Sequence, residues 1–175
     1  HLEYMSDIIT TVKGQAVASL SSDDTEEFTI NELIKRVNIL MKHELKNAYI
    51  YMNVVMKTDE NQIIKGNVNS LVQVVNNMIS NAIQAYDGKH DQNIEMIVNK
   101  KENNIVISIT DFAGGLPKEV QDRLFKEMVT TKGKNGTGLG LYISYSNIKA
   151  HFGGDITYVT ETGKGTTFNI IIPLR

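Results

Sequence analysis

The stretch from residue 111 to residue 141 carries the side chains and glycines of this sequence that are best suited to chemistry. It begins with Asp111-Phe-Ala-Gly-Gly115, directly after residues 104–110, in which isoleucine occupies every second position. Asp111 continues the isoleucine side of that alternation, so its carboxylate is expected to face inward, where an unpaired charge is costly. Taken alone, an Asp before two glycines fits a turn better than a binding site.

A second glycine cluster, Gly136-Thr-Gly-Leu-Gly140, precedes a predicted helix from Leu141 to His151. Backbone N–H groups and the positive end of the helix dipole would face the preceding loop, which favours an anion such as phosphate. The spacing matches neither the dinucleotide fingerprint G-x-G-x-x-G after a strand nor the P-loop pattern that ends in G-K-[ST]. The cluster therefore predicts an anion cradle of another kind.

A row of carboxamides on a predicted helix, residues 71–86, is the third candidate group. Apolar residues form one stripe of this helix, and four carboxamides lie on another face at helical spacing: Gln73, Asn77, Asn81 and Gln84. Amide oxygens are neutral ligands that Mg²⁺ accepts together with phosphate oxygens and water. When the row is considered alone, a solvated polar face is the simpler interpretation, because Asn and Gln are ordinary surface residues.

Together and in this order, the motifs resemble the ATP-binding core of the GHKL superfamily, specifically the catalytic domain of bacterial sensor histidine kinases. The carboxamide row is similar to the N-box, N-x-x-x-N-A, and the glycine clusters to the D-x-G-x-G and G-x-G-x-G boxes. Between the clusters, residues 124–128 resemble the F-box, and Thr131-Lys132 the end of the following T-T-K. Residues 163–166 are similar to the third glycine box, although Gly-Lys-Gly also suits a hairpin turn. The resemblance covers most of the chain.

The resemblance implies an α+β fold, the two-layer α/β sandwich called the Bergerat fold, in which helices cover one face of a mixed sheet. It also implies ATP and Mg²⁺ as ligands. Asp111 would accept a hydrogen bond from the adenine amino group, and Asn77 and Asn81 would hold Mg²⁺ against the phosphates. Asn77 and Lys132 are the implied catalytic residues. The other implied nucleotide-binding positions are Gly115, Thr131, Lys132, Gly136, Thr137, Gly138, Leu139, Gly140 and Thr166.

Asn77 separates two chemistries within the superfamily. In the hydrolytic relatives, the gyrase, chaperone and mismatch-repair ATPases, the corresponding residue is a glutamate that acts as a general base for water. An amide cannot take a proton, so the resemblance implies transfer of the γ-phosphoryl group to a histidine on a dimerisation domain outside this sequence. The other implied partners are a response regulator receiver domain and a second copy of the parent protein. A catalytically degenerate nucleotide-sensing module and a hydrolytic ATPase are the alternatives.

Three positions need separate interpretation. His43 lies in H-E-x-K, which resembles the phosphoacceptor box, but it precedes Asn81 by only 38 positions, too few for a helical hairpin and then a strand and a helix. We therefore expect His43 at the solvent-facing end of the first helix of the ATP-binding domain. Ala113 replaces the first glycine of the first box, which would cost about 1 kcal/mol if the backbone there has a positive φ. Gln84 stands where many relatives carry a basic residue.

The remaining elements position these residues. A short strand at Phe28 leads into a helix whose apolar positions are Leu33, Ile34, Val37, Leu40 and Met41. The segment 125–138, which contains both lysines and glycines, is expected to form a mobile lid. The other predicted strands are residues 48–56, then 94–100 with 105–110 as one hairpin, and 154–161 with 166–172 as another.

The composition bounds the class of protein. The chain has 175 residues, of which 41% are hydrophobic and 22% charged, and this predicts a compact domain. The formal net charge of −2 argues against a general nucleic-acid surface. There is no cysteine, so no disulfide framework exists and a reducing cytoplasm suits the chain. No apolar run is long enough for a membrane span, so this sequence is not expected to contact a membrane.

The first residues differ in pattern from the rest. Residues 1–20 place apolar side chains at alternating spacings of three and four, which is typical of a coiled-coil or bundle helix. We predict that they are the end of a dimerisation and phosphoacceptor helix, followed by a linker at 21–27 and the ATP-binding domain at 28–175. An amphipathic helix that folds back on the core is the alternative. Because the sequence begins with His-Leu-Glu, we expect it to be a fragment of a longer parent protein. We expect the fragment in the cytoplasm, and the parent protein could be anchored in the membrane.

Overall fold

The computed structural model describes residues 26–129 and 137–175, with the backbone alone for 124–129 and 137–140. The helices and strands of these ranges are β1 (Glu27–Thr29), α2 (Ile30–Ala48), β2 (Ile50–Met56), β3 (Ile63–Lys65), α3 (Val68–Ala85), β4 (Gln92–Lys101), β5 (Asn104–Asp111), α4 (Lys118–Val129), α5 (Thr137–Phe152), β6 (Asp155–Glu161) and β7 (Gly165–Pro173). The predicted bundle helix and most of the predicted linker lie outside the described residues.

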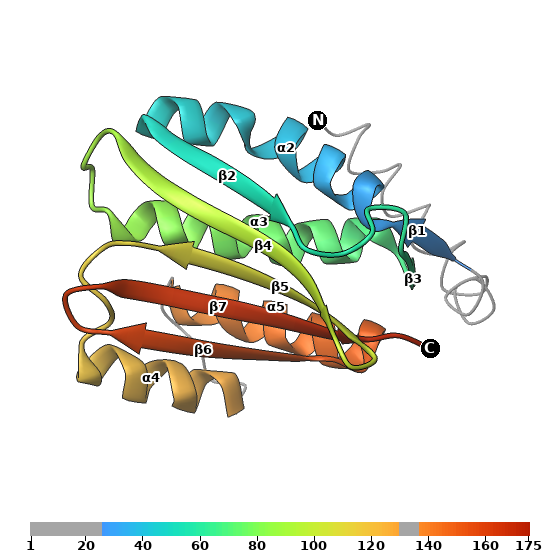
Figure 1. The fold of residues 1–175 in the computed structure, drawn as a ribbon. Coiled ribbons are helices and arrows are strands. Elements are labelled where there is room, and N and C mark those ends of the chain that lie inside the picture. Colours follow the sequence, from blue (N-terminus) through green and yellow to red (C-terminus); the bar gives the residue numbers. More distant parts are fainter. Residues whose placement is uncertain (1–25, 130–136) are drawn as a thin grey trace, which may run out of the picture.

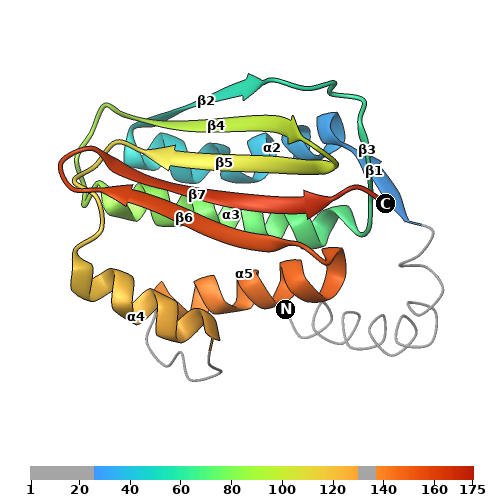
Figure 2. The same cartoon turned by 60° about the horizontal axis from the view of Figure 1, so that its bottom comes forward.

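The architecture is a two-layer α/β sandwich (Figure 1). Five strands form a sheet in the order β2-β4-β5-β7-β6, in which β2 and β4 are parallel and the other neighbours antiparallel. Figure 2 shows the helices gathered on one face of this sheet, while no described element covers the other face. The predicted fold class and the two predicted hairpins are therefore confirmed.

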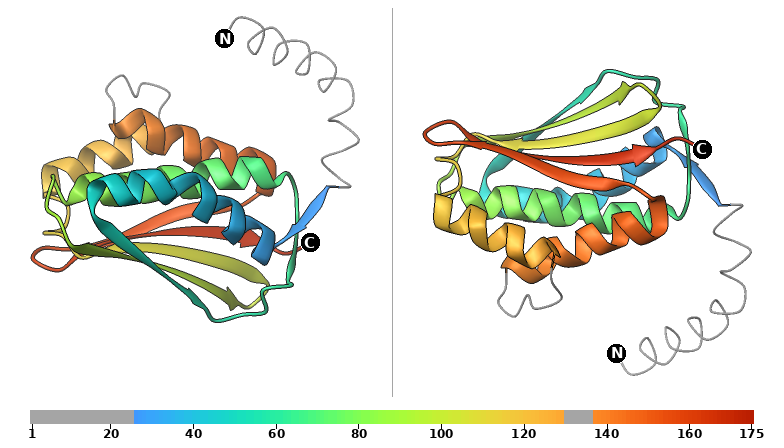
Figure 3. Two further views of the ribbon diagram at one scale, coloured as in Figure 1. Left: turned by 90° about the horizontal axis from the view of Figure 1, so that it is seen from above. Right: turned by 90° about the horizontal axis from the view of Figure 1, so that it is seen from below.

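The helical layer consists of α2, α3 and α5 in that order, with α4 packed against α5 (Figure 3). The middle helix, α3, turns the predicted apolar stripe to the sheet, and the residues of this stripe are buried: Leu71, Val75, Met78, Ile79 and Ala82. The alternate isoleucines of β5 are buried on the facing side of the sheet. Each such aliphatic side chain contributes about 1.5–3 kcal/mol on burial. This packing fixes the rotation of α3, and with it the direction of the carboxamide row.

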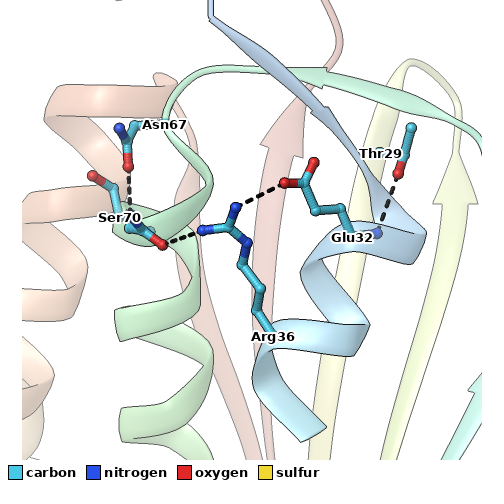
Figure 4. Close-up of polar contacts among 6 residues, drawn as sticks. Thr29, Glu32, Arg36, Asn67 and Ser70 are labelled. Atoms are coloured by element: carbon cyan, nitrogen blue, oxygen red, sulfur yellow. Dashed lines mark hydrogen bonds and ion pairs between the residues drawn. The ribbon is translucent and has the colours of Figure 1, made fainter. Parts of the chain in front are cut away.

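The starts of α2 and α3 are capped, and Arg36 connects the two helices (Figure 4). Asn67 caps α3, because its Oδ1 accepts the backbone N–H of Ser70 at 3.1 Å, and Thr29 caps α2 in the same way. Such caps contribute about 1 kcal/mol each. Arg36 of α2 reaches across and donates to Asn69 Oδ1 at 2.8 Å. The start of α3 is thereby fixed relative to α2.

The outer side of α2 corrects one prediction and confirms another. Leu33, Val37 and Met41 are buried, but Leu40 is 61% exposed. The apolar stripe follows a spacing of four residues, and Leu40 lies about 100° around the helix from Met41, so its predicted burial was wrong. His43 is exposed near the end of α2, as predicted. Among the described helices, none has the length and apolarity needed to cross a membrane.

Candidate functional site

The candidate site is a cavity of about 210 Å³ between the end of α3, the ends of β5 and β7, and the helices α4 and α5. Its apolar walls are Ala85, Leu116, Val120, Leu141 and Phe168. Its polar groups are Asn81, Gln84, Asp111, Arg123 and Thr166. Apolar walls with a few convergent polar groups are typical of small-ligand sites, in which the polar groups orient the ligand.

Asp111 is the buried carboxylate of this cavity. It is the last residue of β5 and lies opposite Thr166 of β7, and each of the two is 4% exposed. Its Oδ1 accepts the backbone N–H of Ala113 at 3.1 Å, and the backbone N–H of Thr166 also donates to the carboxylate. Burial raises the pKa of Asp111, and these two hydrogen bonds offset only part of the rise. The predicted inward direction is confirmed, and the group is a strong acceptor for a ligand N–H.

A tyrosine that the sequence analysis did not single out holds the backbone next to Asp111. Tyr86 is buried at the end of α3, and its hydroxyl accepts the backbone N–H of Phe112 at 2.7 Å and donates to the carbonyl of Asn93. Burial is the main cause of its raised pKa, so the hydroxyl stays protonated and can donate. One side chain thus ties the end of α3 to β4 and to the turn after β5.

The turn after β5 and the turn between β6 and β7 approach each other closely. Gly115 has φ +83°, and a Cβ there would lie 2.6 Å from the carbonyl oxygen of Glu161. A Cβ on Gly165, at φ +142°, would overlap the carbonyl of Asp111. Both positions therefore require glycine, because a side chain would push the two turns apart. Ala113 does not have a positive φ, so the cost that we considered for alanine at this position does not arise.

The carboxamide row of α3 is divided between the cavity, an interhelical contact and solvent. Asn81 and Gln84 line the cavity. Asn77 is half-buried, and its Nδ2 donates to Oγ of the buried Ser144 on α5 at 2.9 Å. Because the nitrogen of Asn77 is committed to Ser144, the oxygen is the atom that can serve a ligand. Gln73 is exposed, so the solvated interpretation holds for this member of the row.

The described part of the second glycine cluster, residues 137–140, lies within the start of α5 and not before it. We predicted that the helix begins at Leu141, but α5 begins at Thr137, so Gly138 and Gly140 belong to its first turn. Glycine is tolerated there because the first four N–H groups of a helix have no partner within the helix. Leu141 lines the cavity, so this first turn lies beside it and can present N–H groups to an anion.

Some predicted site residues cannot be placed, and Arg123 is, after Tyr86, a second residue of the site that the sequence analysis did not single out. Arg123 of α4 lines the cavity and brings a positive charge to it. The only hint in the sequence was its position directly before the F-box-like segment. Outside the described residues lie Thr131, Lys132 and Gly136, in the middle of the predicted lid. The backbone of its residues 125–129 forms the end of α4 and that of 137–138 the start of α5, and the side chains of Thr137 and Leu139 are not described.

Comparison with known proteins gives the family. A family model described as histidine kinase-, DNA gyrase B-, and HSP90-like ATPase matches residues 66–175, more than half of the chain. The chain belongs to this ATPase family. The matched region starts just before α3 and contains every residue that lines the cavity.

Relatives of this ATPase domain are sensor kinases. Sporulation kinase C of Bacillus subtilis is 30% identical over 171 residues, which cover 98% of this chain and 38% of that protein. Sensor histidine kinase ZraS of Escherichia coli is 29% identical over 171 residues, covering 98% of this chain and 34% of that protein. The chain thus spans less than two fifths of the length of these relatives.

Solved structures agree with this placement. The nucleotide-free catalytic domain of histidine kinase ThkA has a TM-score of 0.70 and 27% identity, covering 85% of this chain and 95% of that one. A crystal structure of ThkA in complex with the response regulator protein TrrA shares the fold, with a TM-score of 0.68, 21% identity, and coverage of 98% of this chain and 50% of that one. The resemblance to the histidine kinase branch is confirmed: the ATPase domain is an ATP-binding domain of the sensor histidine kinase type.

Proposed function

We propose that this domain binds Mg-ATP and transfers the γ-phosphoryl group to a histidine of a dimerisation and phosphoacceptor domain. The proposal is carried by two features, one in the cavity and one on α3, a helical turn before Asn81, which lines the cavity. A buried carboxylate, Asp111, can recognise a base, and an amide, Asn77, stands where a hydrolytic enzyme needs a general base.

The base of the nucleotide would enter the part of the cavity formed by Asp111 and Thr166. The carboxylate accepts a hydrogen bond from the adenine amino group, and the apolar walls, such as Leu141 and Phe168, exclude water around the ring. This role requires the ionised carboxylate; burial raises the pKa of Asp111, and two backbone N–H groups that donate to the carboxylate offset part of the rise.

The amide oxygens of Asn77 and Asn81 fit a magnesium ion. Mg²⁺ takes one or two protein oxygens and keeps water and phosphate oxygens as its other ligands, so two neutral amides on one helix face suffice. Ser144 fixes the amide of Asn77 so that its oxygen is the available atom. When bound, Mg²⁺ would neutralise charge on the phosphate oxygens.

The phosphates would lie between the carboxamides and the start of α5. Backbone N–H groups of the first turn, at Thr137, Gly138, Leu139 and Gly140, bind the phosphate oxygens, and Gly115 allows the close turn beside Asp111. Arg123 adds a positive charge from α4. In the segment outside the described residues, Thr131, Lys132 and Gly136 complete the phosphate site, with Lys132 meeting the γ-phosphate.

Transfer, and not hydrolysis, is supported by the amide at position 77 and by the described lining of the cavity. Asp111 is the only carboxylate among the described residues that line the cavity, and it serves the base of the nucleotide. Phosphoryl transfer needs positioning and charge stabilisation and no protein nucleophile in this domain. The nucleophile is therefore supplied by the histidine of the acceptor domain.

The proposal also assigns the parts of the chain and the partners of the parent protein. Residues 1–20 are the end of the dimerisation and phosphoacceptor helix, 21–27 the linker, and 28–175 the ATP-binding domain. The parent is a homodimer that acts in the cytoplasm and passes the phosphoryl group to a response regulator receiver domain. The complex of ThkA with a response regulator supports that class of partner, because ThkA shares this fold.

Calorimetry and a transfer assay test the proposal. ATP should bind more tightly with Mg²⁺ than in excess chelator, and radiolabel from ATP should appear on a phosphoacceptor domain supplied in trans. Asn77→Ala should lower transfer about tenfold or more, which is about 1.4 kcal/mol of transition-state stabilisation. Gln73→Ala, on the same helix but in solvent, is the matched control and should transfer normally.

Other outcomes point to specific errors. Rapid release of free phosphate without the acceptor domain would favour a hydrolytic ATPase, and ATP binding without any transfer would favour a nucleotide-sensing module. Label on the isolated fragment that disappears in His43→Gln would identify His43 as the acceptor after all.

A further inference from the structure

The strand β2 forms one edge of the five-stranded sheet and lacks the residues that usually protect an edge. The strand order places β2 and β6 at the two ends of the sheet. β6 begins and ends with a carboxylate, at Asp155 and Glu161, whereas β2 contains no charged residue and no proline. Edge strands are usually shielded by charges, by proline or by a covering element. β2 is therefore an edge that a further strand can join.

The hydrogen bonds at the two ends of β2 show which of its backbone groups are available. The N–H of Asp91 donates to the carbonyl of Tyr49 at 2.8 Å. The N–H of Lys57 donates to the carbonyl of Val98, also at 2.8 Å. In a parallel pair alternate residues bond to the partner strand, so the odd-numbered residues of β2 face β4. The even-numbered residues, 50 to 56, point their N–H and C=O groups away from β4, where the described residues supply no further strand.

A groove of about 530 Å³ lies beside this edge, between the end of α2 and the start of β2. Tyr49, with φ +55°, ends α2 and turns the chain directly into β2 (Figure 1). Leu45 and Met52 give the groove apolar surface, and Lys42 and Lys46 bring two positive charges to it. Both lysines are exposed, and neither takes part in an ion pair within the described residues. An open strand edge and two available cations thus lie side by side.

The spacing of the two lysines matches the spacing of side chains on an added strand. Four residues of an α-helix rise about 6 Å. Side chains two positions apart on one face of an extended strand are separated by about 6.6 Å. Carboxylates at alternate positions of a strand paired with β2 can therefore meet Lys46 and Lys42 in turn. The side chains between them point to the uncovered face of the sheet, where Tyr51 is 64% exposed.

We propose that the groove between α2 and β2 binds an extended acidic segment of a partner protein, which adds to the sheet as a further strand beside β2. Main-chain hydrogen bonds provide the affinity, and the two lysines select for carboxylates. A second copy of this chain is a poorer occupant, because its β2 brings no carboxylate to the lysines. The groove shares no lining residue with the cavity at Asp111, so the proposal does not depend on nucleotide binding.

The first test uses peptides with the unaltered protein. The probe is an acetylated and amidated peptide, Thr-Val-Glu-Val-Glu-Val-Thr. NMR should show that the probe slows the exchange of the outward amides of Met52 and Val54. Backbone N-methylation of its glutamates, and separately of its valines, removes donors from opposite edges of the added strand while keeping the charge. One of these two peptides should bind at least about tenfold more weakly than the probe and the other nearly as well as the probe.

The second test concerns the charges. Glutamine in place of both glutamates, or Lys42→Ala together with Lys46→Ala in the protein, should weaken binding about threefold to tenfold, because two solvent-exposed ion pairs are lost. Lys100→Ala together with Lys101→Ala is the matched control, since it removes the same charge from exposed lysines at the end of β4. This control should bind the probe normally.

Several results would overturn the proposal. The strand-addition mode is wrong if the probe does not bind at about 1 mM, or if the two N-methylated peptides bind alike. The selection for an acidic segment is wrong if the glutamine peptide binds as tightly as the probe. Slow exchange of the same amides in a concentration-dependent dimer, without peptide, would make a second copy the occupant. These comparisons use the unaltered protein, so they decide the matter even if a lysine variant does not fold.

Discussion

Replacing Asp111 by asparagine removes the charge of the buried carboxyl group and keeps its shape. The group is 4% exposed, so a ligand amino group that donates to it makes a hydrogen bond to a charged acceptor away from bulk water. Such a bond contributes about 1.5–3 kcal/mol. At about 1.4 kcal/mol for each factor of ten, the Kd for ADP should rise about 10- to 150-fold in Asp111→Asn.

The same substitution should change the stability of the fold little, because two effects oppose each other. Burial raises the pKa of Asp111, so the ionised carboxylate is less favourable in the fold than in the unfolded chain, and a neutral amide removes that cost. Asparagine, however, has one acceptor oxygen for the two backbone N–H groups of Ala113 and Thr166. Losing one such bond costs about 1 kcal/mol, so the free energy of unfolding should shift by no more than about 1 kcal/mol.

Calorimetry with ADP and urea unfolding measure the two quantities separately. Asp155→Asn is the matched control, since it changes the net charge equally but affects an exposed ion pair between Asp155 of β6 and Lys149 of α5. It should leave ADP affinity unchanged. An unaltered ADP affinity in folded Asp111→Asn would refute the assignment of Asp111 to the base. A loss of affinity explained by unfolding would refute the reasoning about stability.

The raised pKa of Asp111 also gives the sign of the pH dependence. Its pKa in the fold lies above its pKa in the unfolded chain, so its contribution to stability is greatest at acid pH and falls as the pH rises through the folded-state pKa. The stability of Asp111→Asn relative to the unaltered protein should therefore increase over that interval. The ADP affinity of the unaltered protein should rise over the same pH interval, because the carboxyl group of Asp111 becomes ionised. Titrations with parallel slopes in the two proteins would contradict this account.

Three further substitutions test the site. Asn81→Ala should abolish the gain in ADP affinity that Mg²⁺ provides and leave affinity in chelator unchanged, as calorimetry can measure. Gly115→Ala should destabilise the fold by about 1–3 kcal/mol in urea unfolding, because its Cβ would meet a carbonyl at 2.6 Å, whereas Gly114→Ala enters open space and should be nearly neutral. Tyr86→Phe removes two hydrogen bonds and should cost about 1–3 kcal/mol in the same assay, with weaker ADP binding.

The sequence predicts the fold well because local periodicity and packing agree. Alternation along β5 placed Asp111 on the buried side, and the apolar stripe of α3 fixed where Asn81 and Gln84 point. The glycine of the first box that the backbone requires is Gly115, and the alanine at 113 is harmless because its φ is negative. The sequence motif alone cannot distinguish these two positions, because the backbone φ at each depends on the approach of a turn from another part of the chain.

The residues missed by the sequence analysis act through contacts between distant segments. Tyr86 ends an apolar stripe and looks like an ordinary core aromatic, yet its hydroxyl binds the backbone of Phe112, 26 positions away. Thr160 looks like a common strand residue, yet it binds Leu116, 44 positions away. In the sequence Arg123 is one of many basic residues, and only the packing of α4 beside the cavity distinguishes it. In each case the signal lies in tertiary geometry, which spacing along one element does not contain.

The environment of Asp111 is built from segments that meet only when the sheet is complete. The carboxylate needs the N–H of Thr166, and Thr166 belongs to β7, which pairs with β5 although α4, α5 and β6 separate the two strands along the chain. A ligand that contacts both Asp111 and Thr166 therefore binds the folded sheet and not the unfolded chain. By mass action it stabilises the pairing of β5 with β7. The converse follows by linkage: any substitution that loosens this closure, even one that touches no ligand atom, must weaken base binding. Gly115 and Gly165 are such positions, because each lets the two turns approach where a side chain would hold them apart.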